Sequence, residues 1–269
     1  MNRNSNVYTV IYATVLTVLV AILLTVAALG LAPQQKANSD NEKKQQILSS
    51  ISSVLGKDVT FENAADIWSE LDMDNNMCVV NTKGEELKGI DAFEIVAKQQ
   101  FKAGVVKDEA TLPLFKAIVN GKTYYIMALY GAGLWDAVWG YLSVESDCST
   151  IAGASFDHAS ETAGLGAKIK DDPSFAASFI GKHVFQGENF APVQVLKQGK
   201  SAANGADQVD AITGATKTSD CVSIIINNSL TGYKAYLLAL RNTPCESAQA
   251  AECAACDSTQ IVEPVNKAE

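Results

Sequence analysis

The chain has 269 residues, of which 48% are hydrophobic, and its formal net charge is −9 at pH 7. About 200 residues suffice for one sizeable hydrophobic core, so this length allows one or two domains and requires no second one. The 21 basic residues are outnumbered by 30 acidic residues and form no cluster. The chain therefore lacks the electrostatic footprint of a nucleic-acid-binding protein, and we expect no nucleic acid among its partners.

Residues 7–32 contain no charged side chain over 26 positions. A helix of that length extends roughly 39 Å and can cross a hydrocarbon core of about 30 Å with some tilt. A cleavable signal peptide is the alternative, but its apolar region is usually about 7 to 15 residues long and its basic start is stronger than the lone Arg3. The pattern predicts an uncleaved transmembrane helix after a short segment, residues 1–6.

The sequence leaves open both the orientation of this span and whether another membrane helix packs against it. Arg3 precedes it and three lysines diluted by acidic residues follow it, so the positive-inside rule does not decide its orientation. A stripe of small side chains suits close approach by another membrane helix, and chance in an Ala- and Thr-rich segment explains it equally well. The stripe consists of Ala13, Thr17, Ala21 and Thr25.

Beyond the span, residues 38–55 place apolar side chains at helical spacing in a polar background, which predicts an amphipathic helix leading into a folded domain. We expect that domain to occupy residues 33–242. Short runs of strand-forming residues follow at 77–81, 114–119, 122–130, 138–144 and 150–156. Asn120-Gly121 between two of these runs is typical of a β-hairpin turn.

Helical patterns cover residues 61–71, 92–102, 173–180 and 221–241. Strands and helices are mixed without regular βαβ alternation, so we predict an α+β fold. Residues 243–269 show no periodicity and are rich in Ala and Glu, which predicts a disordered tail.

Few other patterns indicate chemistry. Cys253-Ala-Ala-Cys256 has the spacing of half a zinc site but no second half accompanies it, so we expect no metal centre. Gly131-Ala-Gly133 lacks the third glycine of a dinucleotide fingerprint, and we expect no NADH site. His158 and His183 are interpreted as ordinary residues, and we assign no catalytic acid or base.

The most informative segment is Asp210-Ala-Ile-Thr-Gly-Ala-Thr216. The small residues Gly214 and Ala215 allow close approach to the Thr216 hydroxyl, which precedes a predicted helix with Ser219 and Asp220 as candidate N-cap residues. A phosphodiester on Thr216 would then lie near a helix N-terminus, which favours an anion. A structural loop entering the helix explains the same residues.

Two further segments accompany this one: Gly133-Leu-Trp135 continuing through Trp139-Gly, and Glu161-Thr-Ala-Gly164-Leu-Gly166. Together the three resemble the C subunit of the sodium-translocating NADH:quinone oxidoreductase, over most of the chain. Trp139 stands where that family more often has tyrosine, and Ala163 stands in place of proline. In flavin-binding relatives these segments line the isoalloxazine ring, so the resemblance implies contacts from Trp135, Glu161, Thr162, Gly164 and Leu165.

The resemblance also implies covalent FMN on Thr216, attached by a flavin transferase that uses FAD and magnesium, with Thr213 and Thr218 as less favoured hydroxyls. It implies a single-pass protein of the bacterial inner membrane whose large domain faces the periplasm. The expected function is electron relay among membrane subunits of a complex that oxidises NADH, reduces ubiquinone and exports sodium. One alternative is the G subunit of the related ferredoxin:NAD electron-transport complex. Another is a membrane-tethered binding module without flavin.

Overall fold

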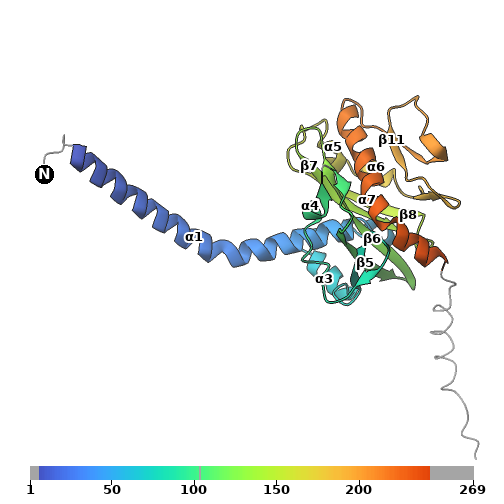
Figure 1. The fold of residues 1–269 in the computed structure, drawn as a ribbon, viewed down its shortest axis with the longest axis horizontal. Helices are drawn as coiled ribbons and strands as arrows, with labels where there is room; N and C mark the ends of the chain where they lie inside the picture. Colours follow the sequence, from blue (N-terminus) through green and yellow to red (C-terminus); the bar gives the residue numbers. More distant parts are fainter. Residues whose placement is uncertain (1–5, 103, 243–269) are drawn as a thin grey trace, which may run out of the picture.

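The structure is a computed structural model that describes residues 6–102 and 104–242. A long helix, α1 (Asn6–Ser49), leads into a domain in which a six-stranded antiparallel sheet has helices on both faces (Figure 1). This confirms the predicted α+β fold. Residues 1–5 of the predicted N-terminal segment 1–6 lie outside the described residues, as does the predicted disordered tail, 243–269.

Helix α1 combines two predicted elements. Its residues 7–32 extend away from the domain, and in the described chain it is the one helix long and apolar enough to be a candidate membrane span. The same helix continues past Pro33 and buries Ile47 and Leu48 in the domain, and Figure 1 shows that it changes direction along its length. The predicted separate helix over 38–55 is therefore wrong in its boundaries. Residues 38–49 belong to α1, and only α2 (Ser52–Leu55) follows after a turn.

The sheet follows the predicted strands closely and has the order β2-β1-β5-β6-β7-β8. Its strands are β1 (Met77–Asn81), β2 (Glu86–Leu87), β5 (Thr111–Val119), β6 (Lys122–Ala132), β7 (Ala137–Val144) and β8 (Ile151–His158). Strands β5 and β6 pair through Val119 and Lys122, and the two residues between them, Asn120 and Gly121, have φ of 52° and 76°. Positive φ at both central positions is the geometry that an Asn-Gly hairpin turn adopts. The predicted hairpin is confirmed.

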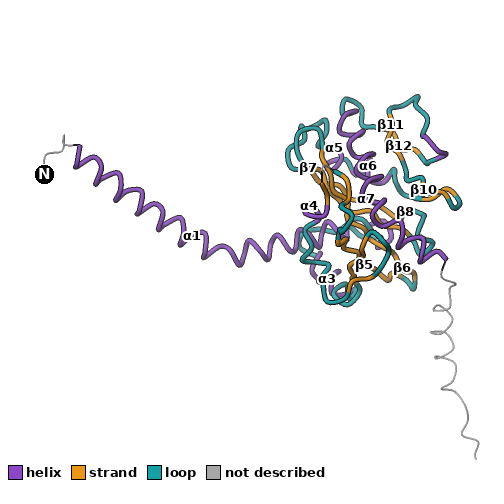
Figure 2. Tube along the Cα trace, viewed as in Figure 1, coloured by secondary structure: helices purple, strands orange, loops and turns teal. Residues whose placement is uncertain are grey.

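Each face of the sheet buries its own hydrophobic cluster. On one face α7 (Thr216–Asn242), α5 (Lys168–Asp171) and α6 (Pro173–Ala177) cover side chains of the sheet such as Leu142 and Phe156. On the other, the end of α1 and α3 (Ala64–Glu70) cover side chains such as Phe115 and Tyr141. Figure 2 shows the strands gathered between the helices, with loops around them. The long apolar runs of the central strands fit burial on both faces.

Tyr233 of α7 joins the helix to the sheet. Its hydroxyl donates to the Pro113 carbonyl at 2.8 Å and accepts from the Ala128 N–H at 3.2 Å. It thereby bridges β5 and β6 next to Pro113, which has no N–H of its own to give to the ladder. Burial raises the pKa of this hydroxyl well above its usual value. This contact fixes α7, and with it the α7 N-terminus, relative to the sheet.

The predicted helix at 92–102 is mostly wrong. Only α4 (Ala97–Gln100) is helical, and Phe101 begins the two-residue strand β3 (Phe101–Lys102), which pairs with β4 (Val105–Val106). The ammonium group of Lys43 on α1 donates to the carbonyls of Phe93 and Ile95. In a helix over residues 92–102 those carbonyls would accept backbone hydrogen bonds. The contact with Lys43 therefore replaces the local preference for a helix.

The other predicted helices form with shifted ends: 61–71 becomes α3, 173–180 becomes α6, and 221–241 becomes α7. Short pairs that the sequence did not predict complete the fold. They are β9 (Phe185–Gln186) with β10 (Asn189–Phe190), and β11 (Gln194–Leu196) with β12 (Gln208–Asp210). The 3₁₀ turn η1 (Ala203–Gly205) lies between the last two strands. Strand β12 delivers the chain to the residues before α7.

Candidate functional site

Glu161 organises a cluster of loops just beyond the end of β8. Its side chain is 7% exposed, and its Oε1 accepts from the backbone N–H of Leu134 at 2.7 Å and of Trp135 at 3.1 Å. Its Oε2 accepts from the hydroxyl of Thr218 at 2.7 Å. One buried carboxylate thus ties the loop between β6 and β7 to the first turn of α7. Its two oxygens are occupied by protein donors, as burial of a carboxylate requires.

Two glycines let the loops reach this carboxylate. A Cβ added to Gly133 would lie 2.5 Å from Glu161 Oε1, and one added to Gly166 would lie 2.5 Å from Oε2 and 2.6 Å from Thr218 Oγ1. Real side chains do not approach so closely, so any larger residue would displace the carboxylate. The sequence pattern named these glycines only as parts of motifs, and the structure gives them this packing role.

Apolar side chains around the cluster remain open to solvent. Trp135 is 69% exposed, with its indole N–H donating to Thr162 Oγ1 at 3.1 Å, and Leu165 is 44% exposed. Leu165 leans over Gly214, where an added Cβ would lie 3.0 Å from Leu165 Cδ2. Exposed aromatic and aliphatic groups held by a rigid polar frame suit a flat, apolar ligand.

Helix α7 begins at Thr216, immediately after Gly214 and the buried Ala215. The N-cap prediction for Ser219 and Asp220 is wrong, because Gly214 at φ 83° turns the chain so that the helix begins three residues earlier than Ser219. Ser219 lies buried in the first turn, and its hydroxyl accepts from the Ile212 N–H at 3.0 Å. It caps the incoming loop instead of its own helix.

The three candidate hydroxyls of this segment differ in their surroundings. Thr213 is exposed in the turn, Thr216 is half-buried at the helix start, and Thr218 is 1% exposed with its hydroxyl committed to Glu161. In the described chain no hydrogen bond is made by the backbone N–H groups of Thr216, Lys217 and Thr218. Unpaired N–H groups at a helix N-terminus attract an anion.

A hollow of about 600 Å³ adjoins the other side of this segment. It is bounded by Thr213, Asp210 and the lysines Lys168 and Lys182. Sequence reasoning missed both lysines. Lys168 follows the Gly-Leu-Gly loop after one residue, Ala167, and this closeness is the one signal that could have indicated it. With Asp172 also in the lining, the two lysines and two aspartates give the hollow a polar border of mixed charge next to the residues before α7.

The remaining sequence candidates lie apart from this cluster or support it indirectly. His158 Nδ1 accepts from the Glu161 N–H at 3.2 Å, and His183 pairs with Asp207 at 2.7 Å. Cys78, Cys148 and Cys221 are free thiols, whereas Cys245, Cys253 and Cys256 lie outside the described residues. Burial raises the pKa of the Cys221 thiol. No group of three possible metal ligands occurs among the described residues.

The structure therefore brings together residues from all three motifs of the resemblance. Trp135 contacts Thr162, Glu161 contacts Thr218, and Leu165 lies against Gly214. The contacts of Glu161 are within the protein, so it frames the site from behind. Trp135 and Leu165 are the side chains exposed at its surface.

Comparison with known proteins assigns the same region. Residues 133–231 match the family model of the FMN-binding domain, and this range contains every candidate residue from Trp135 to Thr216. The family model thus identifies the loop cluster and α7 as parts of an FMN-binding domain. The Glu161 frame, the exposed Trp135 and the open α7 N-terminus fit such a ligand.

Whole-chain relatives share one description. A crystal structure of the C subunit of Na⁺-translocating NADH-quinone reductase from Parabacteroides distasonis is 42% identical, with a TM-score of 0.68, over 77% of this chain and 96% of that one. The C subunit of the Pseudomonas aeruginosa reductase is 27% identical over 264 residues, 89% of this chain and 98% of its own length. The Shewanella oneidensis NqrC structure, 21% identical with a TM-score of 0.61, covers 77% of this chain and 100% of that one, and shares the fold. The chain belongs to the family formed by the C subunit of Na⁺-translocating NADH-quinone reductase.

Proposed function

We propose that this chain is the flavoprotein subunit of a membrane complex that oxidises NADH and reduces quinone, and that it carries FMN as a phosphoester on Thr216. Family membership supports the subunit assignment, since the matched relatives are named as the C subunit of that reductase. The FMN-binding domain match supports the cofactor. The covalent bond and its position are the further steps of the proposal.

The single observation that carries the choice of Thr216 is its place at the first residue of α7. There a phosphate on Oγ1 would lie beside three backbone N–H groups that have no partner in the described chain. Thr218 is a poor alternative because its hydroxyl is buried and donates to Glu161. Thr213 is exposed but precedes the helix, away from its first N–H groups.

The residues around Thr216 would hold the flavin through noncovalent contacts. Trp135 and Leu165 offer apolar surface for the isoalloxazine, and Gly214 and Ala215 keep the approach to Oγ1 free of large side chains. Thr162 fixes the Trp135 indole by accepting its N–H, and Gly164, at φ 72°, forms the turn that carries Leu165. FMN supplies the redox chemistry, whereas the protein supplies position and polarity. No side chain needs to act as a catalytic acid or base.

A covalent phosphoester suits a relay on the far side of the membrane. There a dissociated cofactor would be lost, and covalent attachment removes dissociation. We accordingly propose that the domain faces the periplasm and that electrons pass between other subunits of a sodium-exporting complex. A flavin transferase would move the FMN moiety of FAD to Thr216 Oγ1, breaking the pyrophosphate bond and releasing AMP. NADH oxidation and sodium passage would then reside in those other subunits. Protease accessibility in sealed vesicles of known orientation tests the placement.

The decisive experiment for the attachment is flavin fluorescence of the denatured protein on a gel. Protein from cells that contain the flavin transferase should give a fluorescent band, and Thr216→Ala should abolish it. Thr213→Val is the matched control and should keep full fluorescence. A dark wild-type band would rule out covalent flavin and return the chain to a binding module or a noncovalent flavoprotein. If the wild-type band is fluorescent, mass mapping of the peptide containing Thr216 would locate the added FMN.

A further inference from the structure

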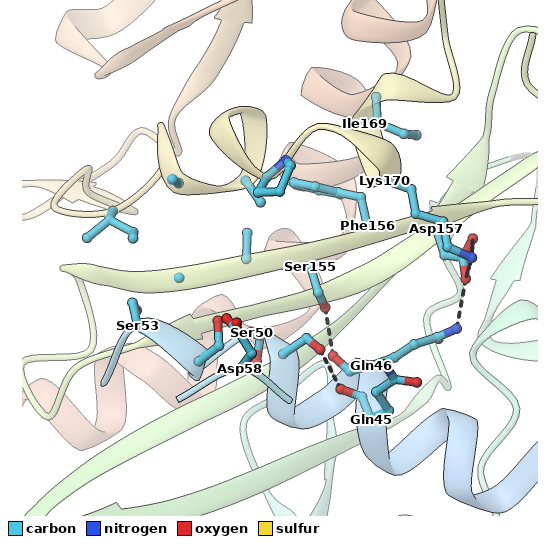
Figure 3. A pocket seen from close by; sticks show the side chains of 18 of the residues that line it. Gln45, Gln46, Ser50, Ser53, Asp58, Ser155, Phe156, Asp157, Ile169 and Lys170 are labelled. Carbon is cyan, nitrogen blue, oxygen red and sulfur yellow. Dashed lines mark hydrogen bonds and ion pairs between the residues drawn. The ribbon is translucent and has the colours of Figure 1, made fainter. Parts of the chain in front are cut away.

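A second feature of the domain is a cleft of about 830 Å³ along the outer edge of the sheet. Its floor is residues 153–157 of β8, the last strand in the sheet order, which pairs with β7 on its other side. The end of α1 with α2 forms one wall, and α5 with α6 forms the other (Figure 3). No member of the candidate flavin cluster lines this cleft.

The hydrogen-bond pattern of β8 shows which backbone groups point into the cleft. Ala159 donates its N–H to the Ala137 carbonyl, which places Ala159 in a hydrogen-bonded pair with the chain of β7. Antiparallel pairing alternates from there, so Asp157 and Ser155 also bond to β7. Phe156 and Ala154 therefore turn their N–H and C=O groups away from β7, toward the cleft.

The opposite end of the strand agrees with this alternation. Past the β-bulge near Ser143 and Val144, the backbone N–H and C=O groups of Ile151 also point away from β7. Both of these groups already have hydrogen-bond partners. The Ile151 N–H donates to the Lys182 carbonyl, and its carbonyl accepts from the Gly181 N–H. The open stretch of the edge is therefore short and lies between Ile151 and Asp157.

No described residue pairs with the outward groups of Ala154 or Phe156. Both residues are only 6% exposed, and buried backbone polar groups in folded proteins are nearly always paired. Two N–H and two C=O groups at strand spacing are the pattern that an added strand satisfies. Extended polypeptide is therefore a partner whose main chain matches these groups.

The two walls define the side chains of that polypeptide. The α1–α2 wall is polar, with Gln45, Ser49 and Ser53, whereas the α6 wall is apolar, with Pro173, Ala177 and Ile180. Successive side chains of a strand point to opposite faces. A strand laid on β8 would place alternate residues against each wall, so polar and apolar side chains must alternate along it.

We propose that this cleft is a docking groove for an extended segment of a neighbouring polypeptide in the membrane complex. The segment adds a seventh strand beside β8, with polar side chains toward α1 and apolar ones toward α6. A second copy of this chain does not fit, because its own β8 edge is recessed between helices in the same way. The proposal rests on the subunit assignment made above and is independent of how FMN is attached.

The far end of the groove is closed by Asp157. Its Oδ1 accepts from the His158 N–H at 2.7 Å, which satisfies the next outward N–H of the strand. Lys170 of α5 pairs with the same carboxylate at 2.8 Å, and Gln46 of α1 donates to it at 2.8 Å (Figure 3). These contacts join the two walls and limit the docked strand to the Ala154–Phe156 stretch.

Amide hydrogen exchange tests the proposal with a control inside the same strand. In the isolated full-length protein in detergent, the amides of Ala154 and Phe156 should exchange fast and those of Ser155 and Asp157 slowly. In the purified complex, the Ala154 and Phe156 amides should slow by roughly tenfold or more, as expected for newly paired strand amides. Ser155 and Asp157 should change little.

The other outcomes are distinguishable. Unchanged exchange in a complex that copurifies overturns the groove proposal and leaves the subunit assignment intact, whereas failure to copurify contradicts that assignment. Slow Ala154 and Phe156 amides in the isolated chain overturn the proposal in one of two ways. Loss of protection on ending the chain at Asn242 assigns the groove to residues 243–269, and concentration dependence assigns it to a second copy.

A matched pair of substitutions adds an assembly test. Ala177 lies exposed on the apolar wall, and Ala65 lies exposed on α3 outside the groove. Ala177→Arg should lower recovery of the complex at least severalfold while the melting temperature stays within about a degree, because exposed substitutions change stability little. Ala65→Arg should change neither. Equal recovery with both variants would contradict the proposal.

Discussion

Two carboxylates near the end of β8 each accept hydrogen bonds from several segments of the chain, but they hold two different kinds of surface. Beyond the strand, the carboxylate of Glu161 gathers donors from the β6–β7 loop and from α7, and leaves Trp135 and Leu165 exposed. Within the strand, the carboxylate of Asp157 gathers Gln46 and Lys170 from the two walls of the groove. The first region presents an apolar surface on a rigid frame, and the second presents unpaired backbone groups.

This difference indicates what each region can bind. The Glu161 cluster has satisfied polar groups behind exposed apolar ones, which suits a small flat ligand placed precisely. The groove lacks partners for main-chain groups, which suits another main chain. The two carboxylates also differ in their donors, since those of Glu161 are neutral and one of those of Asp157 is a lysine. Substitutions of the two carboxylates should therefore lower the free energy of unfolding by different amounts, and these losses should respond differently to salt.

The largest effect is expected from Glu161→Ala. It leaves two part-buried backbone N–H groups and the buried Thr218 hydroxyl without their acceptor, and each unsatisfied buried donor costs roughly 1–3 kcal/mol. Water entering the vacated space would recover part of this. We expect the free energy of unfolding of the full-length protein to fall by about 3 kcal/mol, measured by denaturant titration in detergent. Flavin content should fall with it, because Trp135 loses its fixed position.

Glu161→Gln is the control for this prediction. Its amide oxygen can still accept from Leu134 and Trp135, and its NH₂ group can donate to the Thr218 hydroxyl, which is free to rotate. We expect a loss of about 1 kcal/mol, the difference between a charged and a neutral acceptor. If Gln and Ala cost the same, hydrogen bonding is not what holds the cluster together.

A smaller effect is expected from Asp157→Asn on the groove side of the comparison. The Lys170 side chain is 48% exposed, so solvent screens the ion pair and it contributes little. The buried bonds from Gln46 and His158 contribute more, and an amide can keep only part of them. We expect a loss of about 1–2 kcal/mol. Lys170→Met should cost under about 1 kcal/mol, and that cost should shrink in high salt. A larger loss of stability for Lys170→Met than for Asp157→Asn would contradict the view that the Gln46 and His158 bonds contribute more than the Lys170 ion pair.

The sheet could be predicted from the sequence because its signals are local. Residues 77–81 form β1 with the predicted ends, and Asn120-Gly121 forms the predicted turn. Each depends on a short run of residues whose own preferences agree with the fold. The membrane-span prediction is local in the same sense, since it depends only on the absence of charge over residues 7–32.

The wrong helix predictions arise from side-chain contacts that the local pattern does not record. Residues 92–102 have a helical pattern, but Lys43, about fifty positions earlier, takes the carbonyls of Phe93 and Ile95. Helix α7 begins earlier than the Ser219 signal because that hydroxyl accepts from Ile212. A contact between distant segments decides the first case and a contact across seven residues decides the second, and helical spacing or cap residues alone record neither.

The candidate site was predictable in membership but not in roles. The three motifs named the residues, and the structure brings them together. Ring contact was expected of Glu161 because of its motif, yet its oxygens are occupied by Leu134, Trp135 and Thr218. The groove gave no sequence signal at all, because it depends on which strand lies at the edge of the sheet.

The smallest expected effect tests the Glu161 loop itself. Ala163 stands where the family has proline, its neighbour Thr162 lies outside any helix, and the Ala163 N–H makes no hydrogen bond in the described chain. Proline at a compatible position stabilises by about 0.4–1 kcal/mol, because it restricts the unfolded chain. Ala163→Pro should therefore raise the free energy of unfolding by that amount and leave flavin content unchanged. Gly164→Ala, next to it at φ 72°, should instead cost about 1 kcal/mol. Destabilisation by Ala163→Pro would mean that this chain holds its loop in a shape that proline cannot adopt.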